Sequence, residues 1–408
     1  MEMNLGSGMI FVISMLFLIF SLHSMIKKIN EQTIQLEKKQ QQKKEKSKSI
    51  VTSNMIENEM RSETTPKLFH KISIMTYNIL SQKFAKLNKR LCQENINFDN
   101  RLRFILREII DLNSDIICLQ EVNIEVLNQF FMRPLITFGY SVYYGKCEGS
   151  TFLNLIAFKS FEFRLISYKN LNLSLCEYSN LFIGNRGVFK VEILHKKSNK
   201  TFVVYNVHFP WRPHLEYIKC VILNIILEDT KNLYVNQENV VICGDFNSLP
   251  SSLVLKLMYY DLEKMFFTNT KDNFINNKCP QETDKTQKLF YQILRQKRES
   301  ENFENILSNM EKLSDKYRFR SAYENYQLMK NNITFSNENF SYLNNHTQFT
   351  NFTGMFCGNI DYIFYSQNLI INRILNLINK EDLKNDAHLP SLNFPSDHLK
   401  IYAEFLFK

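Results

Sequence analysis

The chain has 408 residues, of which 22% are charged and 44% are hydrophobic. This balance is typical of a folded globular protein and excludes an intrinsically disordered chain. The 10 glycines and 8 prolines exclude collagen-like and proline-rich sequences. The net charge of +9 is concentrated, because residues 27–48 hold eight lysines and three glutamates. The rest of the chain therefore does not predict a broad surface for polyanions.

An uncharged segment lies near the amino terminus, from residue 8 to residue 26. Because roughly 20 apolar residues span a bilayer as a helix, residues 1–26 are interpreted as a transmembrane anchor. A cleaved signal peptide is the alternative, but no Lys or Arg precedes the segment and no small-residue cleavage motif follows it. Lysines follow it directly, which favours a cytosolic position for the remaining chain on an unidentified membrane. Residues 27–66 are basic and polar and are predicted to form a linker.

From Lys71 onward, short apolar runs alternate with helical patterns, which predicts one α/β or α+β domain over residues 67–408. Predicted strands cover residues 71–80, 115–122, 201–209, 239–247, 359–366 and 398–407. Apolar residues at helical spacing predict a helix between the first two strands and another after the third. Residues 263–318 look like an insertion with amphipathic helices. This insertion is either a surface for a protein partner or a lineage-specific elaboration.

Polar side chains that can bind metal or phosphate follow the ends of these predicted strands. They are Asn78, Glu121, Asn206, His208, Asp245, Asn247, Asp361, Asp397 and His398. If the strands lie side by side in packed sheets, we expect these groups to converge on one rim. Carboxylates and an amide can hold Mg²⁺, histidines can donate to phosphate oxygens, and a separate Asp can deprotonate a water. Each residue alone is weak evidence, but the set predicts hydrolysis of a phosphate ester.

The same strand ends carry an ordered set of motifs that closely resembles the Mg-dependent endonuclease/exonuclease/phosphatase superfamily. The motifs are TYNIL (76–80), CLQEV (118–122), NVHFPWRP (206–213), CGDFNSLP (243–250), IDYIFYS (360–366) and PSDHLKI (395–401). Three further features resemble the branch that holds the poly(A) deadenylases, nocturnin, the Angel proteins and 2′-phosphodiesterase. They are FRSAYENY (319–326), FTNFTGMFCGNIDYIFYS (349–366), and Trp211 with Pro213 after His208.

The resemblance implies an α+β fold, a four-layer α/β/β/α sandwich of the deoxyribonuclease I type, with the site at one end of two packed sheets. It implies that Glu121 is the principal Mg²⁺ ligand, with Asn78 and Asp397 close to the metal or its waters. One or two Mg²⁺ ions suit these ligands, and Mn²⁺ is an alternative.

By the same resemblance, Asp245 would position the attacking water as general base, and Asn247 would hold the scissile phosphate. His398, oriented by Asp361, would donate to the charge that develops in the transition state. His208 would contact another phosphate oxygen.

Three residues match positions that line the nucleotide pocket in the deadenylase branch: Pro213, Asn351 and Phe356. Phe356 would stack on a base, a contact worth roughly 1 to 3 kcal/mol, although an ordinary core position is an equal alternative. The segment 148–163 departs from the family, because it contains extra residues. Its phosphate-side contacts are therefore left open.

The leading hypothesis is a membrane-tethered, Mg²⁺-dependent 3′-to-5′ exoribonuclease of deadenylase type, which releases 5′-nucleotides from RNA 3′ ends, with oligo(A) as the expected partner. A second hypothesis keeps the fold and changes the substrate to a phosphoinositide, a sphingomyelin-like lipid, a 2′,5′-oligoadenylate or NADPH. A non-catalytic scaffold is the third, and it is disfavoured because every expected catalytic side chain is present.

Overall fold

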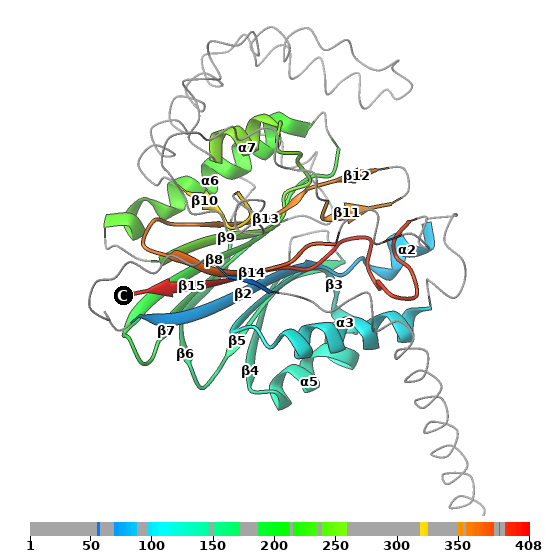
Figure 1. Cartoon of the computed structure of the whole chain (residues 1–408), viewed down its shortest axis with the longest axis horizontal. Coiled ribbons are helices and arrows are strands. Elements are labelled where there is room, and N and C mark those ends of the chain that lie inside the picture. Colours follow the sequence, from blue (N-terminus) through cyan, green and yellow to red (C-terminus); the bar gives the residue numbers. More distant parts are fainter. Residues whose placement is uncertain are drawn as a thin grey trace, which may run out of the picture. The chain divides into compact units, whose positions relative to one another are not determined.

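Two β-sheets packed face to face form the centre of this computed structural model (Figure 1). The structure describes residues 55–57, 69–87, 97–146, 151–171, 187–212, 215–235, 239–258, 319–324, 349–353, 356–378, 383 and 388–408. All of these residues belong to one compact unit, Met55–Lys408. The predicted α+β sandwich of two sheets is confirmed.

The first sheet has seven strands in the order β1-β14-β15-β2-β3-β5-β4. Their bounds are β1 (Met55–Glu57), β2 (His70–Asn78), β3 (Ile116–Asn123), β4 (Tyr140–Lys146), β5 (Phe152–Lys159), β14 (Ile370–Leu375) and β15 (Ile401–Phe407). Strands β2 and β3 run parallel, and the other neighbouring strands run antiparallel.

The second sheet has six strands in the order β10-β13-β9-β8-β7-β6. Their bounds are β6 (Phe163–Asn170), β7 (Gly187–His195), β8 (Lys200–His208), β9 (Asn239–Asp245), β10 (Arg320–Ser321) and β13 (Asp361–Tyr365). Here β8 and β9 form the parallel pair. A separate two-stranded ladder joins β11 (Asn351–Phe352) to β12 (Cys357–Gly358).

The strand directions bring the functional strand ends to one edge of each sheet. Parallel neighbours finish at the same edge, so β2 ends beside β3, and β8 ends beside β9. Strand β13 is antiparallel to β9 and places Asp361 opposite Asp245, so it begins where β9 ends. Strand β15 is antiparallel to β2 and places Ile401 opposite Thr76. The loop that precedes β15 therefore reaches the same edge.

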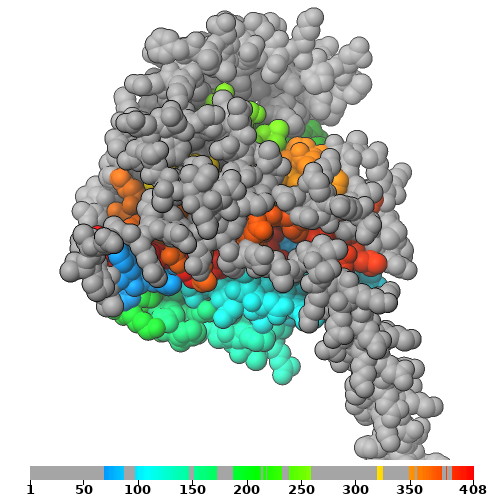
Figure 2. Space-filling view, viewed as in Figure 1, coloured from blue at the N-terminus to red at the C-terminus, as the bar shows by residue number. Residues whose placement is uncertain are grey.

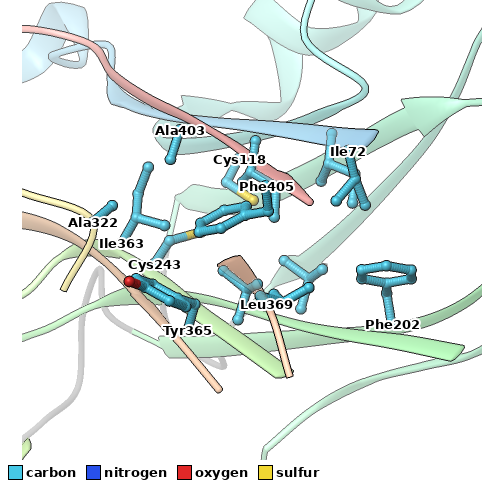
Figure 3. Close-up of a cluster of buried hydrophobic side chains, with 14 of the residues drawn as sticks. Ile72, Cys118, Phe202, Cys243, Ala322, Ile363, Tyr365, Leu369, Ala403 and Phe405 are labelled. Carbon is cyan, nitrogen blue, oxygen red and sulfur yellow. The ribbon is translucent and has the colours of Figure 1, made fainter. Parts of the chain in front are cut away.

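Alternate side chains of both sheets fill the space between them (Figure 3). Ile72 and Cys118 from the seven-stranded sheet share this cluster with Phe202 and Ile363 from the six-stranded sheet. The ring of Phe202 meets the ring of Phe407 edge-on, with 4.8 Å between centroids. This packing fixes the distance between the sheets and hence between the residues at their ends.

Helices cover the outer faces of both sheets. Their bounds are α2 (Gln82–Leu87), α3 (Phe98–Leu112), α4 (Ile124–Val126), a single π-helical turn at Leu127–Phe131, α5 (Met132–Thr137), α6 (Glu216–Val235) and α7 (Leu253–Met258). Ile105 and Ile109 of α3 pack on Met75 and Ile117 of the seven-stranded sheet. The cyan segment that includes α3 forms part of the molecular surface (Figure 2). Helix α6 packs its apolar residues on β8 and β9 in the same way.

Several sequence predictions fall outside the described residues. They concern the anchor at residues 1–26, most of the linker at 27–66 and the insertion at 263–318. Within the predicted linker, Met55–Glu57 forms β1 and pairs with β14. None of the helices in the described part of the chain has the length and apolar character that a membrane crossing requires.

Candidate active site

The polar residues that end β2 and β9 meet across the two sheets. The amide Nδ2 of Asn78 donates to Asp245 Oδ2 over 3.0 Å and to Glu121 Oε1 over 3.3 Å. Its own Oδ1 accepts a hydrogen bond from the backbone N–H of Leu80 at 3.0 Å. Asn78 thus joins one acid of each sheet and directs its amide hydrogens, rather than its oxygen, toward both carboxylates.

The Glu121 carboxylate is aimed at the rim by an irregular strand. Its φ is +60°, and the β3–β5 register shifts between Leu119 and Val122. Such a bulge redirects a side chain, and a non-glycine residue at positive φ costs free energy. The backbone N–H of Ser81 donates to Glu121 Oε2 over 2.8 Å and fixes the carboxylate. The strained backbone therefore supports a functional orientation of Glu121.

Asn206, expected at the rim, instead links the two sheets inside the molecule. It is fully buried, and its Nδ2 donates to the backbone oxygens of Leu119 at 3.0 Å and Leu155 at 2.8 Å. Its Oδ1 accepts from Gln120 Nε2 at 2.7 Å. The role of Asn206 is therefore to tie β8 to the opposite sheet beneath the site.

Asp245 is the most heavily contacted acid of the rim. Its Oδ1 accepts the backbone N–H of Asn247 at 2.8 Å, and its Oδ2 lies 3.6 Å from His208 Nε2 and 3.7 Å from His398 Nε2. Burial raises the pKa of the Asp245 carboxyl above its ordinary value, while His398 opposes the shift. A carboxylate with a raised pKa is better matched to accepting a proton near neutral pH.

His398 forms a buried charged pair with Asp361. Its Nδ1 donates to Asp361 Oδ2 over 2.8 Å. Burial alone would lower the pKa of His398, but Asp361 and Asp245 raise it well above its ordinary value. The imidazole is therefore held in its charged form, with Asp361 fixing the orientation of the ring.

His208 and Asn247 complete the cluster around Asp245. His208 ends β8 directly beside Asp245 in the ladder, and its Nε2 lies 3.9 Å from Glu121 Oε1. The Asn247 Nδ2 donates to Asp245 Oδ2 at 3.1 Å and to Phe209 O at 3.0 Å. These contacts hold the Asn247 amide beside Asp245, where a phosphate oxygen could replace one of its present acceptors.

Asp397 adds another acid on the loop before β15. Burial raises the pKa of its carboxyl, His398 opposes this, and Glu121 adds to it. Among the described residues, Asp397 Oδ1 has no hydrogen-bond partner. An acidic oxygen that is buried without a partner is a natural ligand for a cation.

The charge balance of the rim fits a divalent cation. Its carboxylates are Glu121, Asp245, Asp361 and Asp397. They outnumber the cationic groups nearest to them, which are the Arg101 guanidinium and the imidazolium of His398. Ligand atoms of Asp245, Asp361 and His398 also lie within 4.8 Å of one another, but a charged imidazolium cannot ligate a metal, so the donors left for a cation are the carboxylate oxygens. Oxygen-rich donors of this kind suit Mg²⁺.

Arg101 is a site residue that the sequence analysis missed. It is buried on α3, where its guanidinium donates to the backbone oxygens of Ile79 (2.8 Å), Leu80 (2.7 Å) and Pro395 (2.7 Å). These contacts join the loop after Asn78 to the loop before Asp397. The signal in the sequence is its position four residues before Ile105, on the apolar stripe of the predicted helix.

Lys219 is a second site residue that the sequence analysis missed, because it too lies on the apolar stripe of a predicted helix. It lies within the apolar stripe of α6 and is 1% exposed. Its Nζ donates to the backbone oxygen of Asn247 at 2.5 Å and to Ser248 Oγ at 3.1 Å. The lysine therefore holds the turn that carries Asn247.

Two of the three predicted nucleotide-pocket residues, Asn351 and Phe356, are among the described residues. Pro213 lies outside the described residues. Asn351 is buried in β11 and forms a backbone bridge with His398, beside the site. Phe356 precedes β12 and is 37% exposed. Phe356 is thus not an ordinary core residue, and its ring is accessible for stacking.

Residues 75–398 match the Endonuclease/Exonuclease/phosphatase family, and this range covers most of the chain. The chain belongs to this family. The family resemblance carried by the strand-end motifs is confirmed.

Named relatives lie in the branch that the motifs indicated. The chain is 24% identical over 379 residues to the CCR4-Not complex 3′-5′-exoribonuclease subunit Ccr4 of Candida albicans, covering 84% of this chain and 42% of that protein. It spans less than two thirds of the length of this and the next such relatives.

Two solved structures share the fold. ANGEL2, described as a 2′,3′-cyclic phosphatase, has a TM-score of 0.63 at 20% identity and covers 88% of this chain and 98% of its own. The human Nocturnin catalytic domain has a TM-score of 0.56 at 18% identity, and the match covers 87% of this chain and 98% of the Nocturnin chain. At these identities the likeness concerns the fold.

We predict that Arg101→Met destabilises the protein, because the methionine leaves three buried carbonyl oxygens without their donor. The free energy of unfolding should fall by about 2–4 kcal/mol, measured by urea denaturation. The matched control is Arg103→Met on the exposed side of the same helix, which should cost less than about 0.5 kcal/mol. Equal costs for the two variants would show that Arg101 does not join the loops.

Proposed function

We propose that this protein is a Mg²⁺-dependent phosphodiesterase of deadenylase type, which hydrolyses RNA from its 3′ end and releases 5′-nucleotides. The observation that carries the proposal is the meeting of Glu121, Asp245 and His398, from distant parts of the chain, on one rim. Family membership supports a phosphate ester as substrate. The exoribonuclease activity printed for the Ccr4 relatives supports RNA.

Glu121 and Asp397 are the proposed metal ligands, with Asn78 holding Glu121 in place. When bound, Mg²⁺ would stabilise negative charge on the phosphate and on the leaving oxygen. One such ion is proposed at these ligands, and a second ion stays a prediction, because Asp245 and His398 have other roles in the proposed reaction.

Asp245 is proposed to accept a proton from water while the water oxygen attacks phosphorus. A new phosphorus–oxygen bond forms, and the bond from phosphorus to O3′ of the preceding nucleotide breaks. The departing oxygen takes up a proton from water and Asp245 returns its proton to water, so the products are a nucleoside 5′-monophosphate and an RNA with a free 3′-hydroxyl. His398 donates to a phosphate oxygen from its Nε2, because Asp361 occupies its Nδ1. His208 and Asn247 are proposed to contact the remaining phosphate oxygens.

The substrate is tested by incubating the full chain and Mg²⁺ with labelled A-tailed RNA, 2′,5′-oligoadenylate, NADPH, a phosphoinositide and sphingomyelin. We expect AMP from the A-tail. The rate of AMP release should fall roughly a hundredfold or more in Glu121→Gln and Asp245→Asn. Asp111→Asn, which changes an exposed acid of α3, is the control and should keep the wild-type rate. Exclusive turnover of a lipid or of a small nucleotide would contradict the RNA assignment, and inactivity on all five would favour a scaffold.

The metal is tested apart from activity, by thermal unfolding with and without Mg²⁺. Mg²⁺ at about 100 times its Kd should stabilise the wild type by about 2.7 kcal/mol, and EDTA should remove the effect. Glu121→Gln should lose most of this stabilisation, whereas Asp111→Asn should retain it. The same Mg²⁺ stabilisation in Glu121→Gln would exclude this residue as the principal ligand.

We propose in addition that residues 8–26 anchor the protein in a membrane, with the catalytic unit facing the cytosol. The support is the uncharged run itself and the lysines that follow it. After carbonate extraction of membranes, the full chain should stay in the pellet, and a variant lacking residues 8–26 should be released. Recovery of the full chain in the supernatant would refute the anchor. The partner surface on residues 263–318 stays a prediction.

A further inference from the structure

A cavity of about 460 Å³ opens beside Glu121, on the side formed by α2 and α3. This volume lies within the range of ligand pockets, roughly 300–1,000 Å³. Glu121 belongs to its wall, so the cavity is continuous with the proposed metal site. Asp245 ends strand β9 of the opposite sheet. The reaction mechanism described above uses only the Glu121 end of this space.

The α2 side of the cavity carries two lysines, and the exposed acid Glu125 also lines the cavity. Lys83 and Lys86 of α2 both line it, and both are exposed. In the part of the chain that the structure describes, no acid lies within ion-pair distance of either ammonium group. Arg101, which also borders the cavity, is committed to backbone carbonyls. Two exposed lysines beside a phosphate-cleaving centre are suited to a second phosphate.

The wall of the cavity combines apolar and hydrogen-bonding side chains, as a binding site for a nucleoside requires. Phe98, Leu102 and Val126 supply apolar surface. Asn123 and Gln129 supply amide groups that can hydrogen-bond to a ribose or a base edge. The occupant that matches both the lysines of α2 and this wall is a nucleotide.

The in-line geometry decides which nucleotide this is. An attacking water and a leaving oxygen lie on opposite sides of phosphorus. If Asp245 activates the water, the leaving O3′ departs away from Asp245, on the side of Glu121 and the cavity. Asn351 and Phe356 lie with the β11–β12 ladder next to His398, away from the cavity wall. They suit the terminal nucleotide, which is released.

We propose that the cavity between α2 and α3 binds the penultimate nucleotide of the RNA, and that Lys83 and Lys86 contact the 5′-phosphate of this nucleotide. This inference rests on the proposed exoribonuclease function and adds to it the residues that grip the retained part of the chain. Helix α2 would therefore favour RNA substrates that carry a further phosphate on the 5′ side of the penultimate nucleotide.

Two dinucleotides isolate this contact. Both ApA and pApA contain the bond to be cut, but only pApA carries a 5′-phosphate on the first nucleotide. For the wild-type full chain with Mg²⁺, kcat/KM should be about tenfold higher for pApA than for ApA. In Lys83→Gln/Lys86→Gln, the ratio of the two kcat/KM values should fall to less than about twofold.

Two matched variants control the test. Lys197→Gln/Lys200→Gln removes the same charge from the β7–β8 hairpin, where Lys197 pairs with Glu162, and should keep the tenfold preference. Lys83→Arg/Lys86→Arg should also keep it, because the charge remains. Thermal unfolding of each variant checks that the fold is intact, as expected for exposed side chains.

The outcomes separate this inference from the proposed function. If the wild type releases AMP from A-tailed RNA but shows no preference for pApA, the inference fails and the exoribonuclease stands. The same holds if Lys83→Gln/Lys86→Gln keeps the preference. If the wild type cleaves no RNA, the proposed function fails and the inference falls with it.

Discussion

Repulsion between buried carboxylates is the constraint on which the site depends. Glu121 and Asp397 come from the seven-stranded sheet or the loop leading into it, and Asp245 and Asp361 come from the six-stranded sheet. Burial of such groups is unfavourable unless hydrogen bonds or counter-charges compensate it. Asn78 and His398 compensate part of it. The repulsion that remains is the physical reason for which we propose a divalent cation at this rim and, through it, a phosphate.

Apolar packing between the sheets, away from the site, holds these carboxylates close together. The apolar cluster between the sheets includes Phe202 and Phe405 and sets the separation of the two halves of the site (Figure 3). Asn206 connects the sheets by hydrogen bonds directly below the acids. Because neither half holds a complete set of groups, the chemistry exists only when both sheets are packed. The folding energy of the sandwich thus keeps the carboxylates at the rim, where isolated strands would let them separate.

The sequence predicted the strands that carry the site, because each is a buried apolar run that ends at a polar residue. Strand β9 is buried along its whole length. Strand β6 lacked this signal, since most of its residues are exposed at the sheet edge. Arg101 and Lys219 were missed because each sits within an apolar helical stripe. The positive φ of Glu121 was also beyond prediction, because it follows from how β3 pairs with β5.

The position of the metal tests this account most directly. Crystals grown with Mn²⁺ and measured at a wavelength where manganese scatters anomalously would locate the ion. The account predicts a peak within direct coordination distance of a carboxylate oxygen of Glu121, with Asp397 next to it. A peak held only by Asp245, Asp361 and His398, with Glu121 outside the coordination sphere, would contradict it.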